Sequence, residues 1–80
     1  MDHSLAKLTA DKVAASILRA GRSKASVASA AGIPTSTFGR KIDGHVEFTL
    51  GELLRIARAV GVSPSEYVPA EFSASVPVAA

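Results

Sequence analysis

The sequence predicts a small all-α domain, and three observations lead to this prediction. Apolar residues recur at helical spacing in several stretches, glycines separate these stretches, and no alternating pattern typical of a strand competes with them before residue 68. The glycines that end the expected helices are Gly21, Gly32, Gly44 and Gly61. We therefore expect a compact five-helix domain, with four helices followed by a short fifth one, and a short C-terminal tail.

Length, composition and charge exclude several classes of protein. Eighty residues form one small domain with room for only a few helices. No stretch approaches the roughly 20 apolar residues of a membrane-spanning helix. No charged start with an apolar core suggests a secretory signal, so we expect a cytoplasmic protein. Because the chain contains no cysteine, disulfides and thiolate metal sites are excluded, and an apolar content of 48% argues against a disordered chain.

The first expected helix follows a short lead-in, residues 1–8, and opens the main domain, residues 9–68. Leu5 and Leu8 of the lead-in are placed to pack on the core, and either Ser4 or Thr9 provides the N-cap. The buried stripe of this helix is expected to comprise Val13, Ala14, Ile17 and Leu18.

The stretch from Lys24 to Gly44 divides into two short helices that meet at Gly32. Gly32 takes positive φ at little cost, so it ends the first helix and turns the chain. Pro34 fixes φ near the start of the next helix, where a missing N–H does no harm. The apolar residues that close this corner are Val27, Ala28, Ala31, Ile33, Phe38 and Ile42. The pattern predicts two helices that cross steeply.

Two capping boxes begin the fourth and fifth helices. Thr49 with Glu52 forms the first, and Ser63 with Glu66 forms the second. The expected hydrophobic staples pair Phe48 with Leu53 and Val62 with Tyr67. The apolar face of the fourth helix is expected to comprise Leu50, Leu53, Leu54, Ala57 and Val60, with Arg55 and Arg58 on the outer face.

The tail, residues 69–80, allows two interpretations. Pro69 and Pro77 exclude a helix, and apolar residues alternate with polar or turn residues as on a half-buried strand. The tail is either disordered or a dimer arm that pairs with, or packs on, a second copy. Tyr67, Val68 and this tail are the only candidates for a dimer surface.

Basic residues concentrate on the corner between the second and third helices. Between Asp11 and Asp43 the chain has six basic residues and no acidic one, a charge of +6, whereas the remainder has three basic and seven acidic residues, a charge of −4. Such a span is either ordinary solubilising surface or the electrostatic footprint of a nucleic-acid binder.

Catalytic and metal chemistry find little support. The only histidines are His3 and His45, and no cysteine is present to join them. Asp43 and Glu47 have no apolar surroundings that would shift a carboxyl pKa, and no glycine-rich phosphate loop occurs. We expect no enzyme, metal site, cofactor or small-molecule ligand.

Residues 9–68 resemble the helix-turn-helix family of lambda-type phage repressors and Cro proteins, the XRE-like DNA-binding domains. Three runs carry the resemblance: Lys24 to Gly44, Phe48 to Ala57, and Val60 to Ser63. It implies a lambda-repressor-like fold and a homodimer bound to near-palindromic operator sites in double-stranded DNA. The implied function is transcription regulation, as a repressor or a Cro-like switch protein, and the implied origin is a phage.

By position, the resemblance also implies the DNA contacts. Residues expected to contact base edges in the major groove are Thr35, Ser36, Thr37, Gly39 and Arg40. Residues expected to contact phosphates are Arg22, Ser23, Lys24, Lys41 and His45. Because Thr and Ser read bases weakly, most direct readout falls to Arg40, ideally bidentate to a guanine. Lys41 departs from the family, where many relatives carry an apolar residue, and Ile42 takes the core role.

Two other functions are compatible with the sequence. One is a protein-interaction module, such as an antitoxin-like or adaptor domain, which would bind DNA weakly and without steep salt dependence. The other is an architectural or recombination-directionality DNA binder, which would bend DNA.

Overall fold

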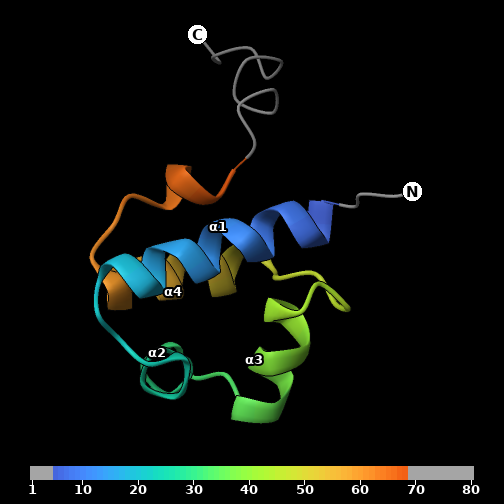
Figure 1. Cartoon of the computed structure of the whole chain (residues 1–80), viewed down its shortest axis with the longest axis horizontal. Helices are drawn as coiled ribbons and strands as arrows, with labels where there is room; N and C mark the ends of the chain where they lie inside the picture. The colour runs from blue at the N-terminus through green and yellow to red at the C-terminus, as the bar shows by residue number, and fades with distance from the viewer. Residues whose placement is uncertain (1–4, 69–80) are drawn as a thin grey trace, which may run out of the picture.

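The computed structural model describes residues 5–68, which form four α-helices and one 3-10 turn and contain no strand (Figure 1). The elements are α1 (Leu5–Arg19), α2 (Lys24–Ala31), α3 (Thr35–Ile42), α4 (Leu50–Val60) and η1 (Pro64–Tyr67). The predicted all-α class and helix order are confirmed, although the expected fifth helix is a four-residue 3-10 turn. None of these helices has the length and apolar character that crossing a membrane requires. The predicted tail, residues 69–80, lies outside the described range.

The helices form two levels in Figure 1. α1 and α4 cross the middle of the molecule, α2 and α3 form its lower edge, and η1 lies above α1. α2 is seen end-on, whereas α3 rises in the plane of the picture, so the two axes cross steeply, as the sequence predicts. α4 packs most extensively on α2, while α1 packs on α3 and η1 packs on both α1 and α4. The corner of α2 and α3 thus packs against both long helices, α2 on α4 and α3 on α1.

Side-chain caps define where the later helices begin. The Thr49 hydroxyl accepts the Glu52 N–H at 3.1 Å, and the Glu52 carboxylate accepts the Thr49 N–H at 2.8 Å, which confirms the first capping box. The second box does not form, because Ser63 caps Ser65 and the Glu66 carboxylate instead accepts a hydrogen bond from Arg19 at 2.8 Å.

The first helix begins earlier than the sequence indicates. α1 starts at Leu5, so Thr9 lies inside the helix and does not cap it, and part of the expected lead-in is helical. Leu5 and Leu8, which were expected to pack on the core, are 53% and 44% exposed. The buried face follows the spacing of Ala6, Ala10, Val13 and Ile17, and both leucines fall beside it.

The core is one apolar cluster with contributions from all four helices and η1. Its members are Ala10, Val13, Ile17, Val27, Ala28, Ala31, Ile33, Phe38, Ile42, Phe48, Leu53, Ile56, Ala57 and Tyr67. Three predicted core positions in α1 and α4 are wrong, since Leu18 is 81%, Leu50 is 77% and Leu54 is 39% exposed. Ser16 and Ile56 are buried instead, because each lies three residues along the helix from another buried residue, Val13 or Leu53.

Tyr67 attaches η1 to α1. Its side chain is fully buried, and its hydroxyl oxygen lies 2.7 Å from the Ser16 hydroxyl oxygen, which in turn donates to the Val13 carbonyl at 2.8 Å. Burial raises the pKa of Tyr67 above its ordinary value, and the Ser16 hydrogen bond opposes that rise only in part. Tyr67 is therefore a core residue and does not belong to a dimer surface.

Candidate nucleic-acid interface

Gly32 forms the corner between α2 and α3. Its φ of 72° and ψ of 29° lie in the left-handed region that glycine enters without strain. The Ile33 N–H donates to the Ala28 carbonyl at 2.9 Å, which is the hydrogen bond that closes a helix ending in this conformation. Pro34 then occupies the N-cap position of α3, one residue earlier than the first helical position.

One face of α3 is fixed to the core. Phe38 is 1% and Ile42 is 8% exposed, and the Phe38 ring meets the Phe48 ring edge-on with centroids 5.9 Å apart. Because residues three or four apart share a helix face, these contacts direct the remaining positions of α3 away from the core. α3 is thus anchored on one side and open on the other.

The residues predicted to contact bases lie on the open side of α3. Thr35, Ser36 and Arg40 are exposed, and Thr37 and Gly39 are partly exposed. Neither α2 nor α3 contains an acidic residue. The open side is therefore polar, and its only charge is the guanidinium of Arg40.

Lys24 and Arg40 are both exposed and, within residues 5–68, form no hydrogen bond or ion pair through their side chains. Lys24 is the first residue of α2, directly after the N-cap Ser23, whose hydroxyl accepts the Ser26 N–H at 3.0 Å. The cap leaves the N–H groups of the first turn before Ser26 without side-chain partners. The start of α2 thus combines a free ammonium group with unpaired N–H donors.

Lys41 does not project outward, contrary to the sequence-based expectation. It is 7% exposed, its Nζ lies 2.5 Å from Glu52 Oε1, and the same nitrogen lies 6.0 Å from the centre of the Phe48 ring. The reason is helical spacing, since Lys41 is three residues after the buried Phe38. Lys41, which was predicted to contact phosphate, therefore forms an ion pair that joins α3 to α4.

The ion pair changes the acidity of Glu52. Burial alone would raise the pKa of this carboxyl group, but hydrogen bonds from Lys41 and from the Thr49 N–H outweigh burial and hold the pKa below its ordinary value. Glu52 is consequently a stable anion at neutral pH, and it keeps Lys41 in place.

Two arginines link α4 to α2 and to the turn that precedes it. Arg22 Nη1 donates to the Ala59 carbonyl at 2.6 Å, and Arg55 Nε donates to the Ala31 carbonyl at 2.8 Å. Each carbonyl lies in the last turn of a helix, where carbonyls lack partners within the helix and a cation is favoured. Arg22 was predicted to contact phosphate, so that role would compete with its bond to α4.

His45, another predicted phosphate contact, follows the end of α3. Its N–H donates to the Arg40 carbonyl at 3.0 Å, and its side chain is exposed. The backbone bond is local, since Gly44 with φ of 84° turns the chain back over the last turn of α3. His45 is thus close to Arg40 along the chain and free to meet a ligand of α3.

Sequence reasoning missed two residues that position the corner, Glu52 and Arg55. It also missed Ser16, which helps attach η1 to α1. Glu52 was recognised as a capping residue, but nothing in the sequence indicates its pairing with Lys41, because the seven residues between α3 and α4 have no periodicity that sets the register of the helices. Arg55 was placed on the outer face, where its long side chain still reaches α2.

Metal binding has no visible basis in the part of the chain that the structure describes. Residues 5–68 contain no group of three or more histidine, aspartate or glutamate side chains placed to hold a metal ion.

Comparison of the chain with protein-family profiles, curated proteins and solved structures finds no match. The function is therefore inferred from the geometry of the α2–α3 corner.

Proposed function

We propose that this protein binds double-stranded DNA sequence-specifically through α3 and regulates transcription, in the manner of lambda-type repressors and Cro proteins. One observation carries the proposal: α3 is fixed by Phe38 and Ile42 and presents the unpaired Arg40 on an open face without acidic residues. A rigid helix with one free guanidinium is the form of side-chain display that base recognition requires.

α3 acts as the recognition helix in this proposal. The major groove, about 12 Å wide, admits an α-helix, and a guanidinium matches the two acceptors on the edge of guanine. Arg40 therefore selects a guanine, and the hydroxyls of Thr35 and Ser36 contribute weaker contacts near the start of the helix. Gly39, where a Cβ atom would meet nothing within 4 Å, permits close approach of the backbone to the DNA.

The start of α2 acts as the phosphate site. A phosphate there accepts hydrogen bonds from the free N–H groups of the first turn. It is also attracted by the positive end of the helix dipole and by the ammonium group of Lys24. Phosphate contacts fix register and orientation without reading sequence. Because Lys41 is held by Glu52, the site depends on Lys24 more than the sequence suggests.

The domain is expected to act as a homodimer on DNA. Its net charge is only +2, and one copy offers few free cations at the corner. Two copies on a near-palindromic site, with recognition helices about 34 Å apart, double these contacts. Occupation of such a site at a promoter blocks transcription without any effector.

Selection of duplexes from a random pool tests the proposal, followed by titration of the selected site at several salt concentrations. We expect a preferred sequence with two-fold symmetry and an affinity that falls steeply with salt. Lys24→Ala should reduce the logarithmic salt slope by about one unit on every sequence. Absence of any selected sequence and of salt dependence would favour a protein-interaction module, and DNA bending without sequence preference would favour an architectural protein.

A further inference from the structure

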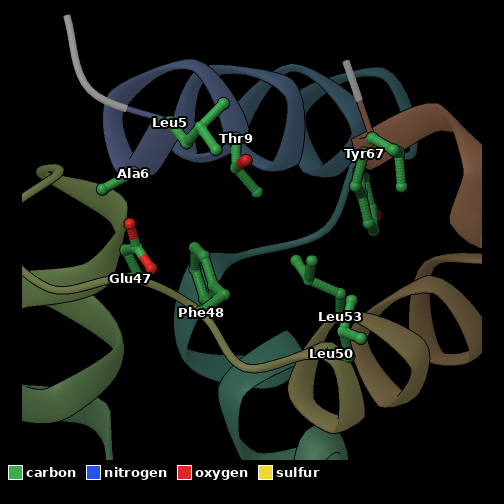
Figure 2. A pocket seen from close by; sticks show the side chains of 9 residues that line it. Leu5, Ala6, Thr9, Glu47, Phe48, Leu50, Leu53 and Tyr67 are labelled. Atoms are coloured by element: carbon green, nitrogen blue, oxygen red, sulfur yellow. The ribbon is translucent and has the colours of Figure 1, made fainter. Parts of the chain in front are cut away.

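An apolar pocket of about 150 Å³ lies on the side of the domain formed by α1, α4 and η1 (Figure 2). Leu5 and Thr9 of α1 face Phe48 and Leu53 across it, and Tyr67 closes one side. No residue of α2 or α3 lines it. The pocket is therefore separate from the proposed DNA-binding face.

The rim of the pocket exposes apolar side chains to water. Leu5 is 53% and Leu50 is 77% exposed, and both line the pocket. Exposed leucines beside an apolar cavity favour an apolar occupant, because covering them removes more apolar surface from water.

We propose that Phe72 of the same chain fills this pocket. A dry apolar cavity of about 150 Å³ is large enough for benzene, so the volume suits one phenyl ring. The chain has three phenylalanines, one tyrosine and no tryptophan, and Phe38, Phe48 and Tyr67 are already buried in the domain. Phe72 is the aromatic side chain that is left.

The connection along the chain makes the contact possible. Val68, the last described residue, itself lines the pocket, and Phe72 is four residues further on. Four residues span up to roughly 14 Å when extended. The chain that leads to Phe72 therefore leaves the described domain at the edge of the pocket.

Size and tethering favour the same chain over a second copy as the source of the ring. Attachment by a short linker raises the effective concentration of the ring at the pocket, into the millimolar range. One ring in this pocket, with two leucines at its rim, buries far less surface than the roughly 1,200 Å² that a stable interface between two proteins buries. Filling it from within the chain attaches η1 to the first turn of α1 and the start of α4.

A single introduced cysteine tests the proposal in the 80-residue chain, which has none of its own. Thr9→Cys places a thiol in the pocket, and Leu18→Cys places one on the exposed side of the same helix. The rate of thiol modification is compared with and without Phe72→Ala, and Val78→Ala serves as the matched change in the tail. We expect Phe72→Ala to speed modification at position 9 roughly tenfold, and to leave position 18 unchanged.

Two further measurements complete the test, and the first needs no introduced cysteine. In the otherwise unaltered chain, Phe72→Ala should shift the methyl resonances of Leu53 and Val68 through loss of the ring current, and leave those of Leu18 in place. The protection of position 9 should not change on dilution. Equal rates with and without Phe72, or unshifted methyl resonances, would overturn the proposal. Protection that disappears on dilution would assign the ring to a second copy and also overturn it.

Discussion

Lys41 Nζ and Glu52 Oε1 lie 2.5 Å apart, and the same carboxylate oxygen accepts the Thr49 N–H at 2.8 Å. One oxygen atom therefore serves the capping box of α4 and the ion pair that holds the end of α3. Both side chains are mostly buried, with 9% and 14% of their surface exposed. The position of α3 is consequently tied to the first turn of α4.

Lys41→Met should lower the free energy of unfolding by about 1–3 kcal/mol, because it leaves a partly buried carboxylate without its cation. The methionine keeps the apolar stem, so the loss reports the charge. Urea unfolding measures it, and a double-mutant cycle with Glu52→Gln should give a coupling energy of about 0.5–3 kcal/mol. Lys12→Met, at an exposed lysine that has no partner within residues 5–68, is the control and should change stability by less than about 0.5 kcal/mol. A coupling energy near zero would show that the pair contributes nothing.

Glu52 should make the domain sensitive to acid. Its pKa in the folded state lies below the ordinary value of 4.5, because the bonds from Lys41 and Thr49 outweigh the opposite effect of burial. Its stabilising contribution is complete above the ordinary pKa and is lost as pH falls through the lower folded value. Unfolding free energy measured against pH should fall less steeply in Glu52→Gln than in the original protein. An equally steep fall in Glu52→Gln would contradict the stabilising role of this carboxylate.

Tyr67 should produce the opposite dependence at alkaline pH. Burial raises its pKa above 10.0, so its contribution is complete below that value and is lost as pH rises through the folded pKa. Since the chain has one tyrosine, phenolate absorbance reports this residue alone. Tyr67→Phe should remove the alkaline loss of stability and cost about 1 kcal/mol at neutral pH through the missing bond to Ser16. A phenolate midpoint at or below 10.0 would contradict the buried position.

Gly32 and Gly39 form a matched pair for the corner. A Cβ atom would meet nothing within 4 Å at either position, so backbone conformation alone decides the effect. Gly32→Ala should destabilise the domain by about 1–2 kcal/mol, since its φ is +72°. Gly39→Ala, inside α3, should stabilise it by up to about 1 kcal/mol. Thermal unfolding checks both, and equal effects of the same sign would show that α2 and α3 do not meet in a left-handed turn.

Local sequence signals predicted most of the fold. The turn at Gly32 and the box of Thr49 with Glu52 depend on neighbours within a few residues, and both form as expected. The periodicity of α3 correctly placed Phe38 and Ile42 in the core. These elements were predictable because the interactions that define them are local.

Contacts between elements were harder to predict. Leu18 continues an apolar run, yet it lies outside the buried face of α1. The smaller Ser16 is buried because Tyr67 offers it a partner. Lys41 looked like a surface cation until α4 brought Glu52 beside it. In each case the deciding partner is distant in sequence, so residue type and spacing could not reveal it.

The central claim is that the open face of α3 reads DNA, and Arg40→Ala tests it most directly. On the duplex selected by the original protein, this change should weaken binding by about 1–3 kcal/mol and relax the preference at one base pair. Arg58→Ala, at an exposed arginine of α4 that is unpaired in the described part of the chain, removes the same charge elsewhere and should leave base preference unchanged. Fluorescence anisotropy on that duplex and its single-base variants measures both. If a folded Arg40→Ala protein binds the duplex with unchanged affinity and base preference, α3 does not read the sequence.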